Sequence, residues 1–249
     1  MELSSFKEML KQQNDHWWFQ GRKLIIKRFL DKLIFTNIPD ILEVGCGTGA
    51  NLVLLQKFGN VTAIEMNAYA RNAAERILNK KILNGYLPDN LPLKDKKYNI
   101  ICLFDVLEHV GNDQDSLKIL NHYLDDQGYL ILTVPAIPML YGKHDKDLHH
   151  FRRYRKKELL ALLEKADFTV KHFTYFNALL LPLAFIARVL DKIMPAKKSL
   201  GSNNPPELLN KLLLKIFSLE LFLMKYSKLP IGLSMLFVVV KNDKNLQRN

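Results

Sequence analysis

The sequence predicts an α/β doubly wound fold with a mostly parallel sheet. Between residues 41 and 134, short runs rich in β-branched residues alternate with stretches of helical periodicity, a pattern typical of βαβ units. The strand-like runs are mostly apolar, as expected where helices cover both faces of a sheet. A glycine-rich turn follows the first run and opens a helix, which is the third indication of this fold class.

Local patterns place each element. Apolar residues repeat every three to four positions between Leu24 and Leu33, which predicts an amphipathic helix before the first strand. Asn67 is suited to cap a helix over residues 68–78. Late strands are expected at 168–176 and 233–240, which are rich in aromatic and β-branched residues. The remaining expectations are strands at 41–44, 61–65, 98–104 and 129–134, a weaker edge strand at 81–83, and helices at 50–58, 113–124 and 158–166.

The chain is expected to consist of a core with two elaborations. Residues 39–176 and 231–241 would form the core, and residues 1–38 an N-terminal arm and helix that act as a lid. Residues 177–230 are too long for a connecting loop and hold two apolar helical patterns separated by AKKSLGSNNPP. They predict a helical insertion before the last strand.

Composition limits the class of protein. The 249 residues suffice for one sizeable domain, and 48% hydrophobic with 24% charged residues excludes a disordered or collagen-like chain. Lys plus Arg number 36 and Asp plus Glu 25, so the net charge of +11 favours anionic partners without choosing among them. Cys46 and Cys102 lie too far apart for a C-x-x-C motif, which excludes a disulfide framework and a cysteine zinc site.

No targeting or spanning segment is expected. The N-terminus lacks an apolar stretch behind a basic start, so it does not resemble a secretory signal. The longest uncharged run, 172–187, is shorter than the roughly 20 residues that a transmembrane helix needs. We therefore expect a cytoplasmic protein, either free or peripheral on the inner face of the membrane.

The glycine-rich turn is compatible with two cofactors. Gly45, Gly47 and Gly49 lie where a ligand can approach bare backbone. The turn also fits the dinucleotide pattern G-x-G-x-x-A, and Glu65 lies 20 residues after Gly45, where a ribose-binding acid belongs. An NAD-dependent oxidoreductase is therefore one alternative.

The negative charge of three acidic residues favours one of these two cofactors. Glu43, Glu65 and Asp105 are all expected at the carboxyl edge of the sheet. A pyrophosphate needs donors there, and carboxylates would repel it. They suit a phosphate-free nucleoside that carries an ammonium and a sulfonium group, which describes S-adenosyl-L-methionine.

Four motifs in this order resemble the class I S-adenosylmethionine-dependent methyltransferases: EVGCGTG at 43–49, AIEMN at 63–67, LPLKDKKYNIICLFDVLEHV at 91–110 and LDDQGYLILTVPA at 124–136. The flanks HWWFQGRK and HDKDLHHFRRYRKKEL resemble a bacterial subgroup similar to quinone-biosynthesis O-methyltransferases. The resemblance implies a Rossmann-like, seven-stranded sheet whose last strand, at 233–240, is antiparallel.

The resemblance also implies roles for the cofactor-binding residues. The glycines of the turn would line the methionyl part, Glu65 would accept both ribose hydroxyls, and Met66 would pack on adenine. The family often has Gly-Asp after the third strand to hold the adenine amine, whereas this chain has Gly85 followed by Tyr86.

The aromatic segment around Trp18 is the basis for the expected lid. Trp17, Trp18 and Phe19 precede Arg22, whose guanidinium suits a bidentate contact with the cofactor carboxylate. We expect Trp18 and Arg22 to contribute to the cofactor site. The alternative is that the tryptophans anchor the first helix to the sheet.

Histidines supply the candidate catalytic residues. Methyl transfer from a sulfonium is an in-line displacement, and a base that takes a hydroxyl proton adds a factor of about a hundred to ten thousand. His109, His149 and His150 are the candidates, with His144 as a further one.

A metal site is a separate hypothesis. Asp105, Glu108 and His109 would share one side of a helix and, with His149 or His150, offer a partial octahedral set for Mg²⁺ or Mn²⁺. The alternatives are that Asp105 caps this helix and that the dipole favours Glu108.

Two basic regions leave their partners open. Residues 152–157 hold five cations in six positions, which suits a nucleic-acid or phosphate patch, a rim for an anionic substrate or lipid headgroup, or a solvated helix start. Residues 177–230 carry eight Lys or Arg against three Asp or Glu beside long apolar stretches. This insert could contact an anionic membrane, form a tunnel or a homodimer face, or serve as extra core.

The sequence predicts a methyltransferase that acts on a hydroxyl of a small-molecule or lipid-linked acceptor. A catalytically silent nucleoside-binding or membrane-peripheral protein is an alternative, as is the oxidoreductase. Nucleic acid is disfavoured as a partner because no separate binding module and no Asn/Asp-Pro-Pro-Tyr-like motif follows Phe104.

Overall fold

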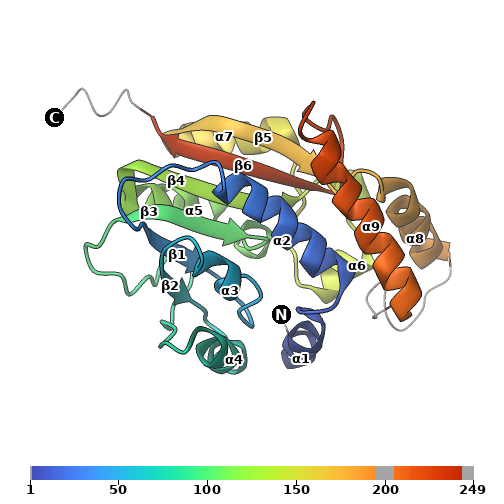
Figure 1. Ribbon diagram of the computed structural model, residues 1–249, viewed down its shortest axis with the longest axis horizontal. Helices are drawn as coiled ribbons and strands as arrows, with labels where there is room; N and C mark the ends of the chain where they lie inside the picture. Colours follow the sequence, from blue (N-terminus) through green and yellow to red (C-terminus); the bar gives the residue numbers. More distant parts are fainter. Residues whose placement is uncertain (1, 194–204, 243–249) are drawn as a thin grey trace.

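The computed structural model describes residues 2–193 and 205–242 and contains a six-stranded sheet between layers of helices (Figure 1). The strands lie in the order β2-β1-β3-β4-β6-β5. They are β1 Asp40–Val44, β2 Asn60–Ile64, β3 Tyr98–Phe104, β4 Leu124–Pro135, β5 Phe168–Phe176 and β6 Ser234–Lys241. The helices are α1 Leu3–Gln12, α2 Trp17–Leu30, α3 Leu52–Leu55, α4 Ala68–Leu78, α5 Asp113–Tyr123, α6 Lys143–Asp147, α7 Lys156–Lys165, α8 Leu181–Ile193 and α9 Glu207–Leu223, with short 3-10 turns η1 Leu107–His109 and η2 Pro138–Leu140.

The topology confirms the predicted mostly parallel sheet and its antiparallel last strand. Strands β1 to β4 pair in parallel, whereas β6 is antiparallel to both β4 and β5. The expected strand count of seven is wrong. The segment at 81–83 forms only one isolated bridge, between Leu83 and Ile64, because the chain then turns at Gly85 and pairs Tyr86 with Asn90.

Helix boundaries follow from caps and glycines. The Asn67 side chain accepts a hydrogen bond from Ala70 N at 3.0 Å, so the predicted cap of α4 is confirmed. Helix α3 is shorter than the expected 50–58, because the glycine loop extends to Gly49, with φ +89°, and the chain turns again before Gly59. A side chain at Gly59 would meet the Pro39 carbonyl oxygen at 2.2 Å.

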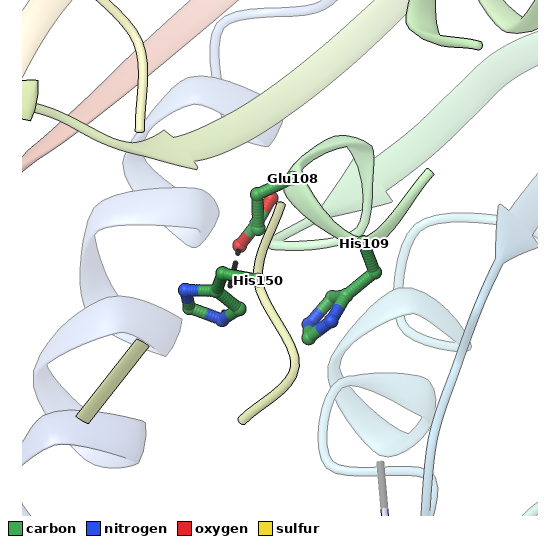
Figure 2. A group of neighbouring side chains, drawn as sticks. All are labelled: Glu108, His109 and His150. Atoms are coloured by element: carbon green, nitrogen blue, oxygen red, sulfur yellow. Dashed lines mark ion pairs between the residues drawn. The ribbon is translucent and has the colours of Figure 1, made fainter. Parts of the chain in front are cut away.

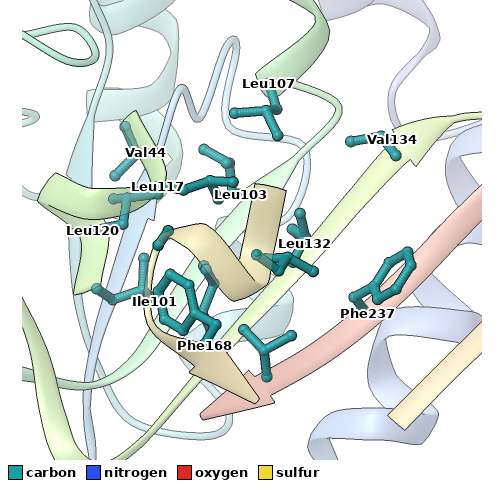
Figure 3. Close-up of a cluster of buried hydrophobic side chains, with 14 of the residues drawn as sticks. Val44, Ile101, Leu103, Leu107, Leu117, Leu120, Leu132, Val134, Phe168 and Phe237 are labelled. Carbon is teal, nitrogen blue, oxygen red and sulfur yellow. The ribbon is translucent and has the colours of Figure 1, made fainter. Parts of the chain in front are cut away.

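Both faces of the sheet are buried. On β4, Ile131 packs into the layer with α2, α3 and α9, and its neighbour Leu132 packs into the layer with α5 and α7 (Figure 3). Adjacent strand residues point to opposite faces, which explains why the strand segments of the sequence are mostly apolar.

Helices α2 and α9 cover one face of the sheet. Helix α1 lies in a segment where no helix was predicted, and α2 begins at Trp17 rather than at Leu24. Helix α9 packs along α2 at Gly21, where an added Cβ would lie 2.1 Å from a Phe217 ring carbon. No helix in the described residues is long and apolar enough to cross a membrane.

Candidate functional site

The glycine loop after β1 exposes backbone beside the end of β3. Gly45, Gly47 and Gly49 have φ values of +71°, +55° and +89°. Residues that carry a side chain rarely adopt this backbone conformation. A Cβ at Gly45 would lie 2.7 Å from a Val106 methyl carbon. The loop therefore touches the segment that carries the other candidate residues.

Glu65, directly after β2, fastens this loop. Its carboxylate is buried and accepts hydrogen bonds from Gly47 N at 2.9 Å and Asn67 N at 2.8 Å. Each oxygen keeps a further lone pair for a ligand hydroxyl. Burial raises the pKa of Glu65, an effect that the two backbone donors oppose. Met66 follows with an exposed side chain at the same strand end.

Glu43 lies beneath the loop as a fully buried carboxylate. Its Oε1 accepts a hydrogen bond from Asn51 Nδ2 at 2.8 Å, while Oε2 has no hydrogen-bond partner among the described residues. Burial raises the pKa of Glu43 to about 7, although the charge of Arg22 acts in the opposite direction. Such a group gains from a ligand that brings a positively charged donor.

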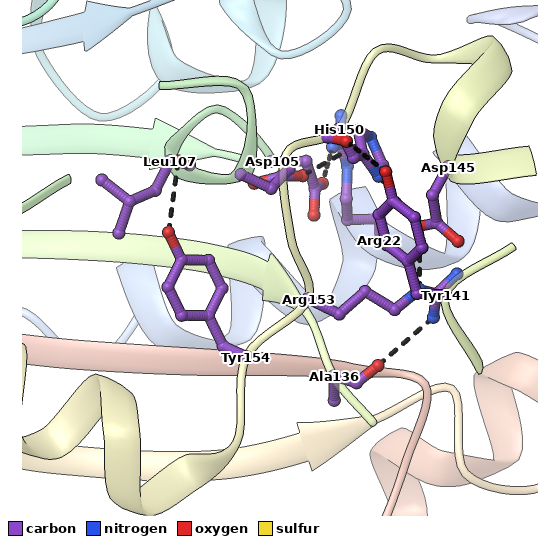
Figure 4. Close-up of polar contacts among 10 residues, drawn as sticks. Arg22, Asp105, Leu107, Ala136, Tyr141, Asp145, His150, Arg153 and Tyr154 are labelled. Carbon is purple, nitrogen blue, oxygen red and sulfur yellow. Dashed lines mark hydrogen bonds and ion pairs between the residues drawn. The ribbon is translucent and has the colours of Figure 1, made fainter. Parts of the chain in front are cut away.

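The N-terminal segment covers the glycine loop. Thr48 Oγ1 donates a hydrogen bond to Gln13 Oε1 at 2.7 Å. Arg22 forms a buried ion pair with Asp105 (Figure 4), and its guanidinium lies 4.5 Å from the centroid of the Trp18 ring. Arg22 Nε has no hydrogen-bond partner among the described residues. The N-terminal segment therefore contacts both the glycine loop and Asp105 at the end of β3.

Asp105 neither caps a helix nor belongs to the candidate metal-binding cluster, two of the roles expected for it. It has a φ of +54° and precedes η1 without capping it, since Val106 occupies the cap position. The expected helix with Asp105, Glu108 and His109 on one side is only this three-residue turn. Asp105 pairs with Arg22 instead.

Glu108, His109 and His150 form the cluster that could hold a metal ion. Each offers a ligand atom, and these atoms all lie within 4.8 Å of one another (Figure 2). Burial, followed by the charge of Asp105, raises the pKa of Glu108 well above its ordinary value. Burial lowers the pKa of His109 to about 4, so its imidazole is neutral near pH 7.

His150 is held by a carboxylate on one side and faces another. Its Nδ1 lies 3.0 Å from Asp145 Oδ1, and its Nε2 lies 4.0 Å from Glu108 Oε1. Arg153 Nε donates to the same Asp145 oxygen at 2.8 Å. Burial favours the neutral form of Asp145, but these hydrogen bonds and the Arg153 charge outweigh it and hold the pKa of Asp145 below its ordinary value.

The other histidines occupy different surroundings. His149 is exposed, has a φ of +58° and lies outside the cluster. Burial lowers the pKa of His144 to about 3, and the charge of Arg188 adds to this effect. Among the predicted bases, the structure therefore brings together His109 and His150.

The three arginines of the basic run at 152–157 each pair with an acidic residue of the same chain. Arg152 Nη1 lies 2.7 Å from Asp113 Oδ2, and Arg155 Nη1 lies 3.3 Å from Glu158 Oε1. Arg153 is buried against Asp145. These pairs reduce the cationic surface that the sequence suggested at this position.

Sequence reasoning missed Gln13, Asn51, Asp145 and Arg153. Gln13 reaches the glycine loop from 35 positions away, so no local spacing marks it. Asp145 and Arg153 belong to the segment whose resemblance to other sequences was noted, and this resemblance was the one available signal.

Comparison with known proteins identifies the family. A family model described as a methyltransferase domain matches residues 15–172, more than half of the chain. The chain belongs to this methyltransferase family. The match includes the glycine loop, Glu65 and the cluster around His150.

Related proteins agree with this family. A ubiquinone biosynthesis O-methyltransferase of Rickettsia akari is 26% identical over 149 residues, covering 53% of this chain and 59% of the relative. Alignments with this and other curated relatives span 53–65% of the relatives' lengths.

Solved structures show the same fold. An S-adenosylmethionine-dependent methyltransferase from Archaeoglobus fulgidus matches with a TM-score of 0.56 at 16% identity, over 89% of this chain and 96% of that one. An O-methyltransferase of Brevibacillus brevis, solved with S-adenosyl-L-homocysteine, has a TM-score of 0.55 at 16% identity, over 90% of this chain and 76% of that one.

Proposed function

We propose that this protein is an S-adenosylmethionine-dependent methyltransferase that methylates a hydroxyl oxygen of a small-molecule or lipid-linked acceptor. The observation that carries the cofactor assignment is a pair of buried, unsatisfied atoms beside the glycine loop. Arg22 Nε is a donor without an acceptor, and Glu43 Oε2 is an acceptor without a donor, among the described residues. An amino acid supplies the carboxylate and the ammonium group that would satisfy both.

The remaining residues fit the rest of this cofactor. Glu65 has lone pairs for the two ribose hydroxyls, and exposed Met66 offers an apolar surface for adenine. The bare backbone of Gly45, Gly47 and Gly49 would line the methionyl part. When bound, S-adenosylmethionine supplies an electrophilic methyl group on a positively charged sulfur.

His150 is the proposed general base. The Asp145 carboxylate, which remains ionised, favours the tautomer with the proton on Nδ1 and so leaves Nε2 free to accept a proton. Nε2 would take the hydroxyl proton as the acceptor oxygen receives the methyl group that the bound cofactor would supply, with the demethylated thioether as the leaving group. The neutral His109 ring packs against His150 with centroids 4.6 Å apart and limits its orientation. Exposed His149 would contact the acceptor.

Oxygen as the acceptor atom is supported by this histidine and by the name of the Rickettsia akari relative, an O-methyltransferase. Removing the proton of a hydroxyl is the step for which a base is useful. The identity of the acceptor depends on loops that vary among proteins of one fold.

Residues 1–38 are the proposed lid. Gln13 and Arg22 both reach the loop region from this segment, through Thr48 and Asp105 respectively. Release of these contacts would admit the cofactor, and their return would exclude water from the methyl group.

Isothermal titration tests the cofactor assignment. The protein is titrated separately with S-adenosylmethionine, S-adenosylhomocysteine and NAD. Micromolar affinity for the first two and none for NAD is expected. Binding of NAD alone would favour an oxidoreductase and overturn the proposal, and binding of the nucleosides without methylation of any hydroxyl acceptor would favour a silent binding protein.

A further inference from the structure

Helix α9 is apolar on two opposite faces, but only one of them is covered. Leu213 and Phe217 are buried, and Phe217 packs against Gly21 of α2. On the other side, Leu208, Leu212 and Phe222 are 83%, 52% and 52% exposed. A helix of a soluble domain normally places charged residues on its outer face. The outer stripe of α9, defined as Leu208, Leu212, Lys215, Leu219 and Phe222, follows spacings of four, three, four and three residues.

Helix α8 adds a second exposed apolar surface. Leu183, Phe185 and Ile186 are all exposed. Figure 1 places α8 and α9 at the same end of the molecule, together with α6. Buried Glu220 of α9 accepts hydrogen bonds from Ala178 N at 2.7 Å and Leu179 N at 2.9 Å, which ties the segment before α8 to α9.

The charges on this surface are mainly positive. Lys215 lies within the outer stripe, Lys211 beside it and Lys225 just beyond it, and all three are exposed. Of the two acids on α9, Glu220 is buried and Glu207 pairs with Lys211 at 2.5 Å. The exposed leucines are therefore flanked by lysines with little negative charge nearby.

We propose that the outer stripe of α9 and the exposed face of α8 rest on an anionic lipid surface. Apolar side chains would enter the boundary between headgroups and acyl chains, and Lys211, Lys215 and Lys225 would meet the lipid phosphates. A second copy of the chain is a poorer occupant, because it would bring the same lysines and a net charge of +11 against this surface. The proposal concerns a surface that contains none of the candidate cofactor residues and does not depend on the proposed reaction.

Vesicle co-sedimentation with the full chain tests this surface. The protein should bind vesicles of phosphatidylcholine mixed with phosphatidylglycerol and should not bind phosphatidylcholine alone. High salt should reduce binding, because it screens the lysine contacts. Equal binding to both vesicle types, or no binding at low salt, contradicts the proposal.

Paired variants localise the contact. The double variant Leu212→Glu with Phe222→Glu should weaken vesicle binding at least about tenfold. A control, Ile34→Glu with Ile38→Glu, changes two exposed apolar residues between α2 and β1 and should bind as the parent does. Circular dichroism and thermal unfolding verify that both variants are folded.

The molecular mass of the protein in solution tests whether a second copy of the chain covers the outer stripe. If the parent is a dimer that Leu212→Glu with Phe222→Glu converts to a monomer while vesicles are not bound, the stripe is a self-interface and the proposal is wrong. If the folded double variant binds vesicles as tightly as the control, the contact lies elsewhere and the proposal is also wrong.

Discussion

The two halves of the candidate site are held together differently. In the cofactor half, Glu65 is fixed by backbone N–H groups of Gly47 and Asn67. In the acceptor half, His150 is fixed by the side chains of Asp145 and, through it, Arg153. Backbone donors remain after any substitution except proline, whereas side-chain contacts change with each replacement. The donors that position Glu65 are therefore suited to stay constant while the contacts of His150 vary.

The largest expected effect lies in the cofactor half. Glu65→Ala should weaken S-adenosylmethionine binding about a thousandfold, because two hydrogen bonds to a charged group contribute together about 4 kcal/mol. Titration calorimetry measures the Kd. Glu164→Ala removes an exposed acid on α7 and serves as the control. Unchanged affinity in a folded Glu65→Ala protein would remove Glu65 from the site.

Substitutions in the acceptor half should lower turnover without changing cofactor affinity. His150→Ala should lower kcat at least about a hundredfold, because the general base is lost, with the cofactor Kd unchanged. Asp145→Asn should give a smaller loss, since the base remains but its orienting carboxylate is gone. His122→Ala, at an exposed position, is the matched control. Full activity of His150→Ala would assign proton removal to another group.

Cofactor affinity should increase with pH because Glu43 must ionise to meet a cation. With a pKa of about 7, Glu43 is mostly protonated near pH 6, and the Kd there should be about tenfold weaker than near pH 8. His109 and His144, with pKa values of about 4 and about 3, stay neutral throughout this window. Calorimetry at several pH values measures the slope, which Glu43→Gln should flatten. An unchanged slope in Glu43→Gln contradicts this role.

The stability contribution of Glu43 has the opposite sign. Its folded pKa is raised from 4.5 to about 7, so the folded protein binds the proton more tightly than the unfolded chain. This contribution is therefore present below about pH 4.5 and is lost as the pH rises to about 7. Relative to the parent, Glu43→Gln should lose less stability over this window in chemical denaturation.

The smallest effect is expected from metal removal. Incubation with a chelator should leave both cofactor binding and turnover unchanged, because Asp105 pairs with Arg22 instead of joining the cluster and His150 is proposed to act as a base. Methylation assays before and after chelation measure this. Loss of turnover that Mg²⁺ or Mn²⁺ restores would assign Glu108, His109 and His150 to a metal rather than to a base.

Much of the fold could be predicted because it depends on local patterns. Strand β3 and helix α4 have their predicted boundaries, since apolar runs and the Asn67 cap are signals within a few residues. Helix α1, which lies against the glycine loop at Gly47, was missed although its few apolar residues repeat at helical spacing, because the segment is short and otherwise polar. The edge strand expected at 81–83 was overestimated. The chain turns at Gly85, so this segment forms one isolated bridge instead of a strand.

The candidate cofactor residues could be proposed from sequence, because they lie at or directly after the carboxyl ends of predicted strands. The partners of the histidines could not. Asp145 lies on a short helix and meets His150 across a loop, and Arg22 meets Asp105 across 83 positions. The Arg22–Asp105 contact arises from tertiary packing, for which one sequence carries no spacing rule. The Asp145–His150 contact is local and depends on the turn that follows the short helix α6.

Gly21 is the contact point between helix α9 and the part of α2 that carries Arg22. The α2 backbone there lies directly against the Phe217 ring of α9, with no Gly21 side chain between them that could yield. The next residue, Arg22, holds Asp105 at the cofactor site. A displacement of α9 would therefore reach the Arg22 guanidinium through the α2 backbone.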